Sequence, residues 1–419
     1  MLNENSIVGQ MKKRIGFTIL MMLFGLSSLY AGKIPVIYIT TADSSAITSR
    51  DYWKENTRLQ IVMPDGSVSY QSKRALIRAR GNSTYNKPKK SFALKLENDT
   101  PLLGMTANKR WVLLANFMDH SLLRNSLALA IAKQTSLEWT ADSRLVDVVV
   151  NGNLQGCYLF CESIRLGKHR VNIDEEQGFL IEIDNYPNEE YRFETKYRHL
   201  PVNVAYPKSP TNKQMKNIES YLNRIERILY DNESDLRELY LNYIDIDSFV
   251  DWWLVHELTQ NAEPNGPRSC FMYKDKNGLL KAGPVWDFDL AFITVGLDAG
   301  GDIRPSRLNR QDVMLLTGDS IYNRNALWYD RFLKDSVYTN HVKERWDELE
   351  PKFRLLTNDL DNWEKLIEPS ALADEELWRG QDPARFDIFQ DWKSSIANLK
   401  EVYMYRIESL KKLLGTKDF

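Results

Sequence analysis

The chain has 419 residues, and its 55 Lys and Arg nearly balance its 57 Asp and Glu, for a formal net charge of −2. This balance argues against a nucleic-acid-binding protein, because contact with phosphate backbones requires an excess of basic residues. Three cysteines are too few for a disulfide scaffold. In an extended strand Cys157 and Cys161 would lie about 13 Å apart, too far to bridge, so we expect them to be buried thiols.

The first 31 residues have the layout of a secretory signal peptide. Basic residues at 12–14 precede the mostly apolar stretch 15–30, and small residues follow at 31–32. The stretch is shorter than the roughly 20 apolar residues of a comfortable membrane span. We therefore set residues 1–31 aside and expect a secreted, periplasmic or cell-surface protein. An uncleaved signal anchor is the membrane-bound alternative.

Residues 32–200 are predicted to form a β-rich lobe with one helix. Apolar runs and alternating patterns predict the strands, and Asn151-Gly152-Asn153 predicts a hairpin turn. Asp119 or Ser121 is the candidate N-cap of the helix, whose apolar positions run from 122 to 131. The expected strands are 36–40, 58–62, 75–80, 91–96, 111–115, 145–150, 156–162 and 179–184.

Residues 201–419 are predicted to form a mainly helical lobe that also holds a hairpin and a strand around Trp286. The expected helices are 214–230, 234–243, 247–259, 337–354 and 384–414. The fold class is therefore α+β. A β-rich N-terminal lobe followed by a mainly helical C-terminal lobe is the plan of a two-lobed, atypical protein-kinase-like fold.

Two aspartates interrupt the apolar run Gly283–Phe292, which we predict to be a buried strand. A buried carboxylate destabilises a fold unless a cation, a donor or a metal compensates it. In an extended strand Asp287 and Asp289 would point to the same side, where they could share a hard divalent cation. A strand-end turn whose aspartates accept backbone N–H groups is the structural alternative.

A second polar segment, Arg80-Gly81-Asn82-Ser83-Thr84, lies between two predicted strands and is followed by basic residues within 87–90. Glycine and small polar residues can present N–H groups to phosphate oxygens, and Arg and Lys add charge-assisted hydrogen bonds. The spacing is neither that of a Walker loop nor that of the glycine-rich loop of ordinary kinases. An ordinary hairpin with a solvated basic tip is the alternative.

Five motifs in this order resemble the spore coat protein H (CotH) kinase family, over roughly residues 75–295 and more weakly to about 400. The matching segments are Arg80–Ser83 with Lys89–Phe92, Leu123–Asn125, Gly156–Tyr158 with Glu162, Gly178–Asp184, and Trp286–Asp289. The resemblance implies an atypical kinase that transfers phosphate from ATP to Ser or Thr of a protein substrate. It also implies a divalent metal, Mg²⁺ or Mn²⁺.

By this resemblance Asp287 is the metal-binding aspartate, and Asp289 is a second candidate ligand. Glu263, in the segment Asn261-Ala262-Glu263, stands where the family has an aspartate. It would orient the acceptor hydroxyl. Because glutamate reaches one methylene further, Glu263 either keeps this role or marks a subgroup with altered chemistry.

Phosphoryl transfer requires basic side chains on the phosphates. We expect Arg80, Lys90 or Lys95 to supply them, with Asn82 and Ser83 binding the nucleotide from the same loop. Lys95 lies inside a predicted strand, as the strand lysine of kinases does. A solvent-facing lysine is the alternative.

Three further polar residues have weaker signals. Glu162 follows an apolar strand and could pair with such a lysine or contact the nucleotide, or be a strand-end acid. Arg124 is expected to pair locally with Asp119 rather than with phosphate. The five histidines show no metal-binding spacing, and His256 is expected to pack beside the tryptophans of its helix.

Two other classes of function remain open at the level of sequence. A glycoside hydrolase would use paired carboxylates, but the basic cluster at 87–90 has no role in its mechanism. A non-catalytic, pseudokinase-like surface or assembly protein would explain Glu263. Magnesium-dependent nucleotide binding distinguishes a kinase from both.

Overall fold

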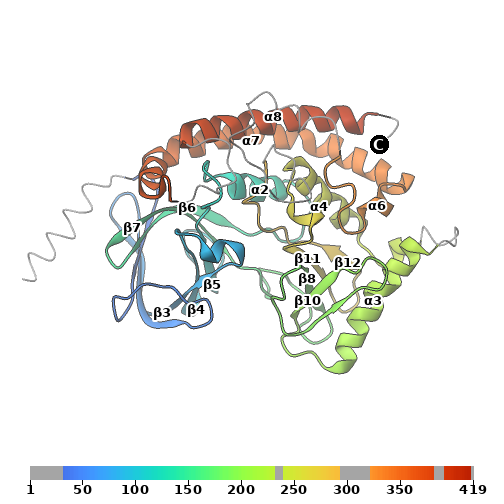
Figure 1. Ribbon diagram of the computed structural model, residues 1–419, viewed down its shortest axis with the longest axis horizontal. Helices are drawn as coiled ribbons and strands as arrows, with labels where there is room; N and C mark the ends of the chain where they lie inside the picture. Colours follow the sequence, from blue (N-terminus) through green and yellow to red (C-terminus); the bar gives the residue numbers. More distant parts are fainter. Residues whose placement is uncertain (1–31, 232–238, 293–320, 382–390, 417–419) are drawn as a thin grey trace, which may run out of the picture.

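The computed structural model describes residues 32–231, 239–292, 321–381 and 391–416 (Figure 1). The predicted signal peptide and parts of the predicted helices 234–243 and 384–414 lie outside these ranges. Within the described ranges, no helix combines the length and apolar character that crossing a membrane requires.

The N-terminal part of the chain folds into a closed barrel of seven strands. In spatial order these are β1 (Val36–Thr40), β2 (Lys54–Val62), β3 (Val68–Arg80), β4 (Ser91–Thr100), β5 (Asn108–Leu114), β7 (Asn153–Glu162) and β6 (Ser143–Val150). Strand β1 closes the barrel by pairing in parallel with β6. Alternating residues of β4, including Phe92, Leu94 and Leu96, fill the barrel interior. The period-two pattern in the sequence therefore predicted these strands correctly.

A second, five-stranded sheet packs beside the barrel. Its order is β12 (Leu280–Ala282), β11 (Cys270–Lys274), β8 (Phe179–Ile183), β10 (Pro201–Tyr206) and β9 (Arg192–Glu194). In β8, Ile181 and Ile183 join the core shared with the helices, whereas Leu180 joins a separate apolar cluster on the other side of the sheet. The lobe boundary predicted at residue 200 falls inside this sheet, because β8 pairs with β11 of the C-terminal part.

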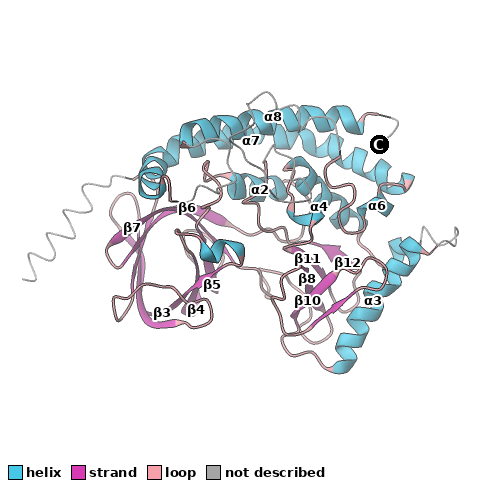
Figure 2. Cartoon of the chain, in the orientation of Figure 1, coloured by secondary structure: helices cyan, strands magenta, loops and turns pink. Residues whose placement is uncertain are grey.

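Long helices cover one side of both sheets (Figures 1 and 2). Helices α7 (Ser336–Trp378) and α8 (Trp392–Leu414) run side by side across the barrel and the second sheet. Beneath them lie α2 (Arg124–Lys133) and α4 (Ile246–Leu258). Helix α3 (Asn212–Tyr230) flanks the second sheet, and the short α6 spans Tyr329–Phe332.

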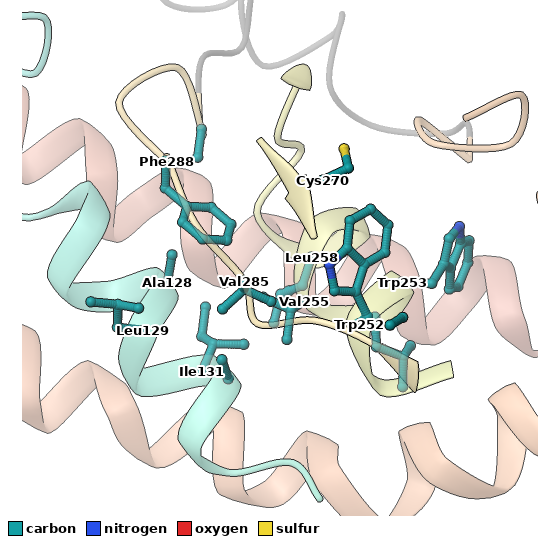
Figure 3. Packing of buried hydrophobic residues seen from close by; sticks show 14 of the residues in the cluster. Ala128, Leu129, Ile131, Trp252, Trp253, Val255, Leu258, Cys270, Val285 and Phe288 are labelled. Atoms are coloured by element: carbon teal, nitrogen blue, oxygen red, sulfur yellow. The ribbon is translucent and has the colours of Figure 1, made fainter. Parts of the chain in front are cut away.

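Helices α2 and α4 pack through apolar side chains (Figure 3). Ala128, Leu129 and Ile131 of α2 lie near Val255 and Leu258 of α4, together with side chains of the segment that follows β12. Phe288 of that segment is fully buried in the same core. The position of the segment is therefore fixed by the helical core.

One local prediction differs from the structure and another is confirmed. Helix α2 begins at Arg124 after Leu123, so neither Asp119 nor Ser121 is its N-cap residue. The carboxylate of Asp119 nevertheless accepts the N–H of Arg124 at 2.8 Å, from a turn that precedes the helix. All three cysteines are buried and free, as predicted for Cys157 and Cys161.

Candidate active site

The segment that carries Asp287 is a loop and not the predicted strand. Strand β12 ends at Ala282, and Asp287 adopts a left-handed backbone conformation with φ 63°. Aspartate tolerates this conformation better than most residues, and it breaks the extended geometry that the apolar run suggested. The loop is held from both sides: Asn261 donates to the carbonyl of Asp287 at 3.0 Å, and Asn125 accepts the N–H of Phe288 at 2.9 Å.

The carboxylate of Asp287 is half-buried and lies among charges of both signs. It accepts the backbone N–H of Asp289. Burial raises its pKa, while the positive charges of Arg80 and Arg268 act in the opposite direction. The negative charge of Asp184 adds to the effect of burial. Asp287 is therefore a carboxylate at which additional positive charge would be stabilising.

Asp289 has a different environment from Asp287. The side-chain amide of Asn125 donates to its carboxylate, and Arg124 donates to its carbonyl at 3.0 Å. Burial raises the pKa of Asp289 to about 7, and repulsion from Asp287 contributes to the same shift. Because this segment is not extended, the expectation that both aspartates point to one side no longer follows. The side-chain amide of Asn125 in α2 therefore already supplies one hydrogen bond to the carboxylate of Asp289.

Glu263 begins a short 3₁₀ helix, Glu263–Asn265, and its side chain is buried. Its carboxylate forms an ion pair with Arg268 at 2.8 Å. Burial raises the pKa of Glu263 to about 8, with repulsion from Asp287 as the next cause. Its backbone N–H donates to Asn261 at 3.3 Å. The side chain of Asn261 thus contacts the backbone of both Glu263 and Asp287 and fixes the positions of these two residues relative to each other.

Strand β8 and the residue that follows it supply two acids, Glu182 and Asp184, that the sequence motif contained but that we did not assign to the site. Asp184 accepts the N–H groups of Tyr186 at 2.7 Å and Ser269 at 3.0 Å, and its charge raises the pKa of Glu263. Glu182 has a pKa raised to about 8 by burial and then by Asp184. The alternation of acids with apolar residues in Gly178–Asp184 is the signal that could have identified them.

Arg80 connects the barrel to the Asp287 loop. It ends β3, and its guanidinium lies 5.6 Å from the centre of the Trp286 ring. The predicted phosphate segment is therefore next to the predicted metal aspartate. Asn82 donates to Asn188 at 2.9 Å, and Ser83 begins the 3₁₀ helix η1 (Ser83–Asn86).

The lysines near this segment have separate environments. Lys89 is fully buried and pairs with Asp374 of α7, so its role is structural. Lys90 donates to the carbonyl of Tyr85 at 2.6 Å, and burial lowers its pKa. Lys95 is half-buried on β4, in register with Arg110 of β5.

Glu162 pairs with an arginine and not with a lysine. Its carboxylate contacts Arg170 at 2.5 Å and accepts the N–H of Asp142 at 3.0 Å. Burial raises its pKa. The guanidinium of Arg170 also lies 5.5 Å from the centre of the Trp111 ring. The proposed pairing with a strand lysine is therefore wrong, because Arg170 occupies that position.

The local pairings expected for Arg124 and His256 are confirmed. Arg124 contacts Asp119 at 3.5 Å. The ring of His256 lies 4.0 Å from that of Trp252, and burial lowers the pKa of His256 to about 3. His256 also stacks on Phe288, at 5.1 Å between ring centres, and so supports the Asp287 loop.

Across the described residues, no group of three or more His, Cys, Asp or Glu side chains is placed to hold a metal ion. This arrangement differs from that of a metal site built from protein ligands alone. It is compatible with magnesium, which commonly takes one or two carboxylates and completes its octahedral shell with waters and phosphate oxygens. The mutual repulsion of Asp287, Glu263 and Asp184 fits such a cation.

No curated protein matches the chain. The sequence model of the CotH kinase protein family matches residues 77–410, which include the end of β3 and the later barrel strands, the acids around Asp287 and most of α8. The match covers most of the chain and includes every candidate site residue named above. The chain therefore belongs to the CotH kinase protein family.

Proposed function

We propose that this protein is a kinase that transfers phosphate from ATP to a Ser or Thr hydroxyl of another protein, with Mg²⁺ or Mn²⁺ as the metal. Family membership supports a kinase-like enzyme. The observation that supports transfer to a protein hydroxyl is that Asn261 joins the two acidic residues. Its side chain accepts the backbone N–H of Glu263 at 3.3 Å and donates to the backbone carbonyl of Asp287 at 3.0 Å. Phosphoryl transfer needs one acid at the acceptor and another at the metal, close together.

Asp287 is the residue that would hold the metal, because Asp289 already accepts a hydrogen bond from Asn125. A bound divalent cation would neutralise phosphate charge during transfer. Arg80, beside Trp286, would contribute a fixed guanidinium to the same phosphates. Asp287 and Arg80 both lie in segments that pack against the rest of the protein, and this packing supports a site that is preorganised for transfer.

Glu263 would receive the acceptor hydroxyl. Its carboxylate can accept the proton of a Ser or Thr hydroxyl, and the adjacent Arg268 favours the ionised form. The raised pKa makes the ionised carboxylate a stronger proton acceptor near neutral pH. Glutamate in place of aspartate is therefore compatible with transfer in this site.

A non-catalytic role is the second candidate, and the Glu263–Arg268 ion pair favours it. A carboxylate already paired with an arginine could serve only to hold the loop. Incubation of the purified protein with labelled ATP and Mg²⁺ or Mn²⁺ separates the two candidates. The kinase proposal predicts label on Ser or Thr that disappears with a metal chelator, whereas a non-catalytic protein would remain unlabelled.

We also propose export, on the basis of the signal-peptide pattern in residues 1–31. The acceptor protein would then lie at the cell surface, in the periplasm or in the medium. An uncleaved N-terminus would tether the same kinase to the membrane.

A further inference from the structure

Five cationic side chains gather on the outer face of the barrel next to the Asp287 loop. Arg78 and Arg80 lie two residues apart on β3, and Lys95 and Arg110 occupy paired positions on β4 and β5. Their alternation with the barrel interior, where Ile77 and Leu94 are buried, places them on the outside. Arg165 joins them from the segment after β7.

Aromatic rings hold these arginines in place. The guanidiniums of Arg78 and Arg110 lie 4.7 and 4.9 Å from the centre of the same ring, that of Trp53. Arg165 donates to the hydroxyl of Tyr206 at 3.1 Å. Tyr206 and Trp286 pack against the same apolar cluster of the second sheet. The arginines are thus oriented by aromatic faces, which leave guanidinium N–H groups available to an anion.

The positive charge of this cluster is weakly compensated. The buried arginines Arg170 and Arg406 have carboxylate partners, Glu162 and Glu257. Arg78 and Arg110 are half-buried. For Arg110, by contrast, burial lowers the pKa, and the nearby charges of Arg165 and Arg78 lower it further.

For Arg78, burial is again the main cause of a lowered pKa, and among the described residues the acid that acts against this shift is Asp51, which is exposed. The Nε of Arg78 is buried without a hydrogen-bond partner among the described residues. An arginine in this state gains free energy when an anion supplies both charge and acceptor oxygens.

A small residue lies directly opposite Arg78 in the sheet. Ala93 pairs with Arg78 across β3 and β4 and lies two residues from Lys95 on the same face. On its other side Ala93 pairs with the buried Val112 of β5, so both of these side chains are shorter than those of Arg78 and Lys95. The cluster is therefore suited to a compact anion with several charges rather than to a single carboxylate.

We propose that Arg78, Arg110 and Arg165, together with Arg80, form a polyphosphate-binding site that holds the triphosphate of the nucleotide. The site is continuous with the candidate active site, because Arg80 contacts Trp286 next to Asp287. The inference deepens the proposed function and rests on it for the identity of the nucleotide. It assigns phosphate binding to arginines of the barrel wall and not to the lysines at 87–90.

Binding of inorganic tripolyphosphate in the presence of a metal chelator tests this site by calorimetry. Arg78→Gln and Arg110→Gln should each weaken binding about tenfold, because each removes charge-assisted hydrogen bonds. Arg74→Gln is the matched control: Arg74 lies on the same strand but is exposed and pairs with Glu97. It should stay within about twofold of the unchanged protein.

Arg78→Lys keeps the charge while losing the planar guanidinium, so it should bind better than Arg78→Gln. Circular dichroism and thermal melting verify that each variant is folded. Absence of tripolyphosphate binding to the unchanged protein, or equal binding by all variants, would overturn the proposal. Binding of polyglutamate that tripolyphosphate does not displace would overturn it in favour of an acidic peptide site.

The outcome is separable from the kinase proposal. Metal-free tripolyphosphate binding without any phosphate transfer would retain the arginine site and reject the kinase. Transfer with an unchanged KM for ATP in Arg78→Gln and Arg110→Gln would retain the kinase and reject the arginine site.

Discussion

At the scale of single residues, Asn261 connects the two acids of the candidate site. Its amide contacts the carbonyl of Asp287, and its side-chain oxygen accepts the N–H of Glu263. The side-chain nitrogen of Asn261 also lies 3.3 Å from Nδ1 of His256, and this contact connects Asn261 to helix α4. Both acids are therefore positioned by one buried side chain.

Substitutions at Glu263 test its role as the acceptor-side acid. Glu263→Asp keeps the carboxylate and should retain at least part of the transfer rate. Glu263→Gln removes the negative charge and should reduce kcat by about 100-fold, which is the usual range for a general base. Phosphate transfer is measured at saturating ATP, with thermal melting as a check on folding. Equal activity of both variants and the unchanged protein would show that Glu263 does not take part.

At the scale of elements, the Lys89–Asp374 pair fixes α7 to the barrel. Both side chains are buried, and Asp374 also accepts the N–H of Cys157 in β7 at 2.9 Å. The ammonium of Lys89 additionally donates to the carbonyl of Cys157 at 2.6 Å. This buried charge pair therefore helps to hold helix α7 on the barrel, together with the hydrogen bond from Ser370 to Asp147.

Lys89→Met should lower the free energy of unfolding by about 3–5 kcal/mol, because it leaves Asp374 buried without its cation. Denaturant titration measures this change. The control is Lys73→Met on β3, where the side chain is exposed and the expected change lies within about 0.5 kcal/mol. A stability of Lys89→Met equal to that of the control would mean that the pair contributes nothing.

Strand patterns were predictable because alternation is a local property, and the barrel strands were found from it. The conformation of Asp287 was not predictable, because Asn125 and Asn261 from distant elements impose it on an apolar run. The grouping of β8 with the first lobe failed for a similar reason: its partner β11 is distant in sequence.

The candidate site was likewise predictable where its residues lie in local motifs, and not where their roles depend on contacts between distant segments. The motifs located Asp287, Glu263 and Arg80, which the structure brings together. They did not reveal Asp184, whose effect depends on the packing of β8 against the Glu263 segment.

At the scale of the whole molecule, buried acids make stability depend on pH. Asp147 of β6 is fully buried, and burial raises its pKa to about 7, with Asp374 adding to the shift. The hydroxyl of Ser370 and the charge of Lys89 act in the opposite direction. Since the pKa is higher in the folded than in the unfolded chain, this group stabilises the fold at low pH. That contribution is lost as pH rises through about 7.

Asp147→Asn should therefore remove part of the loss of stability between pH 5 and pH 8. The difference between the variant and the unchanged protein should be on the order of 1–4 kcal/mol, favouring the variant at the higher pH. Melting temperatures across this pH range measure the effect. Parallel pH profiles for the two proteins would contradict a raised pKa at Asp147.

Asp287→Asn, assayed for phosphate transfer from labelled ATP with Mg²⁺ or Mn²⁺, tests the central claim most directly. The substitution keeps the size of the side chain and removes the charge that a hard cation requires. We predict a folded protein whose metal-dependent transfer falls by about 100-fold or more, while metal-free tripolyphosphate binding is retained. Wild-type transfer by this variant would contradict the assignment of Asp287 as the metal-binding residue.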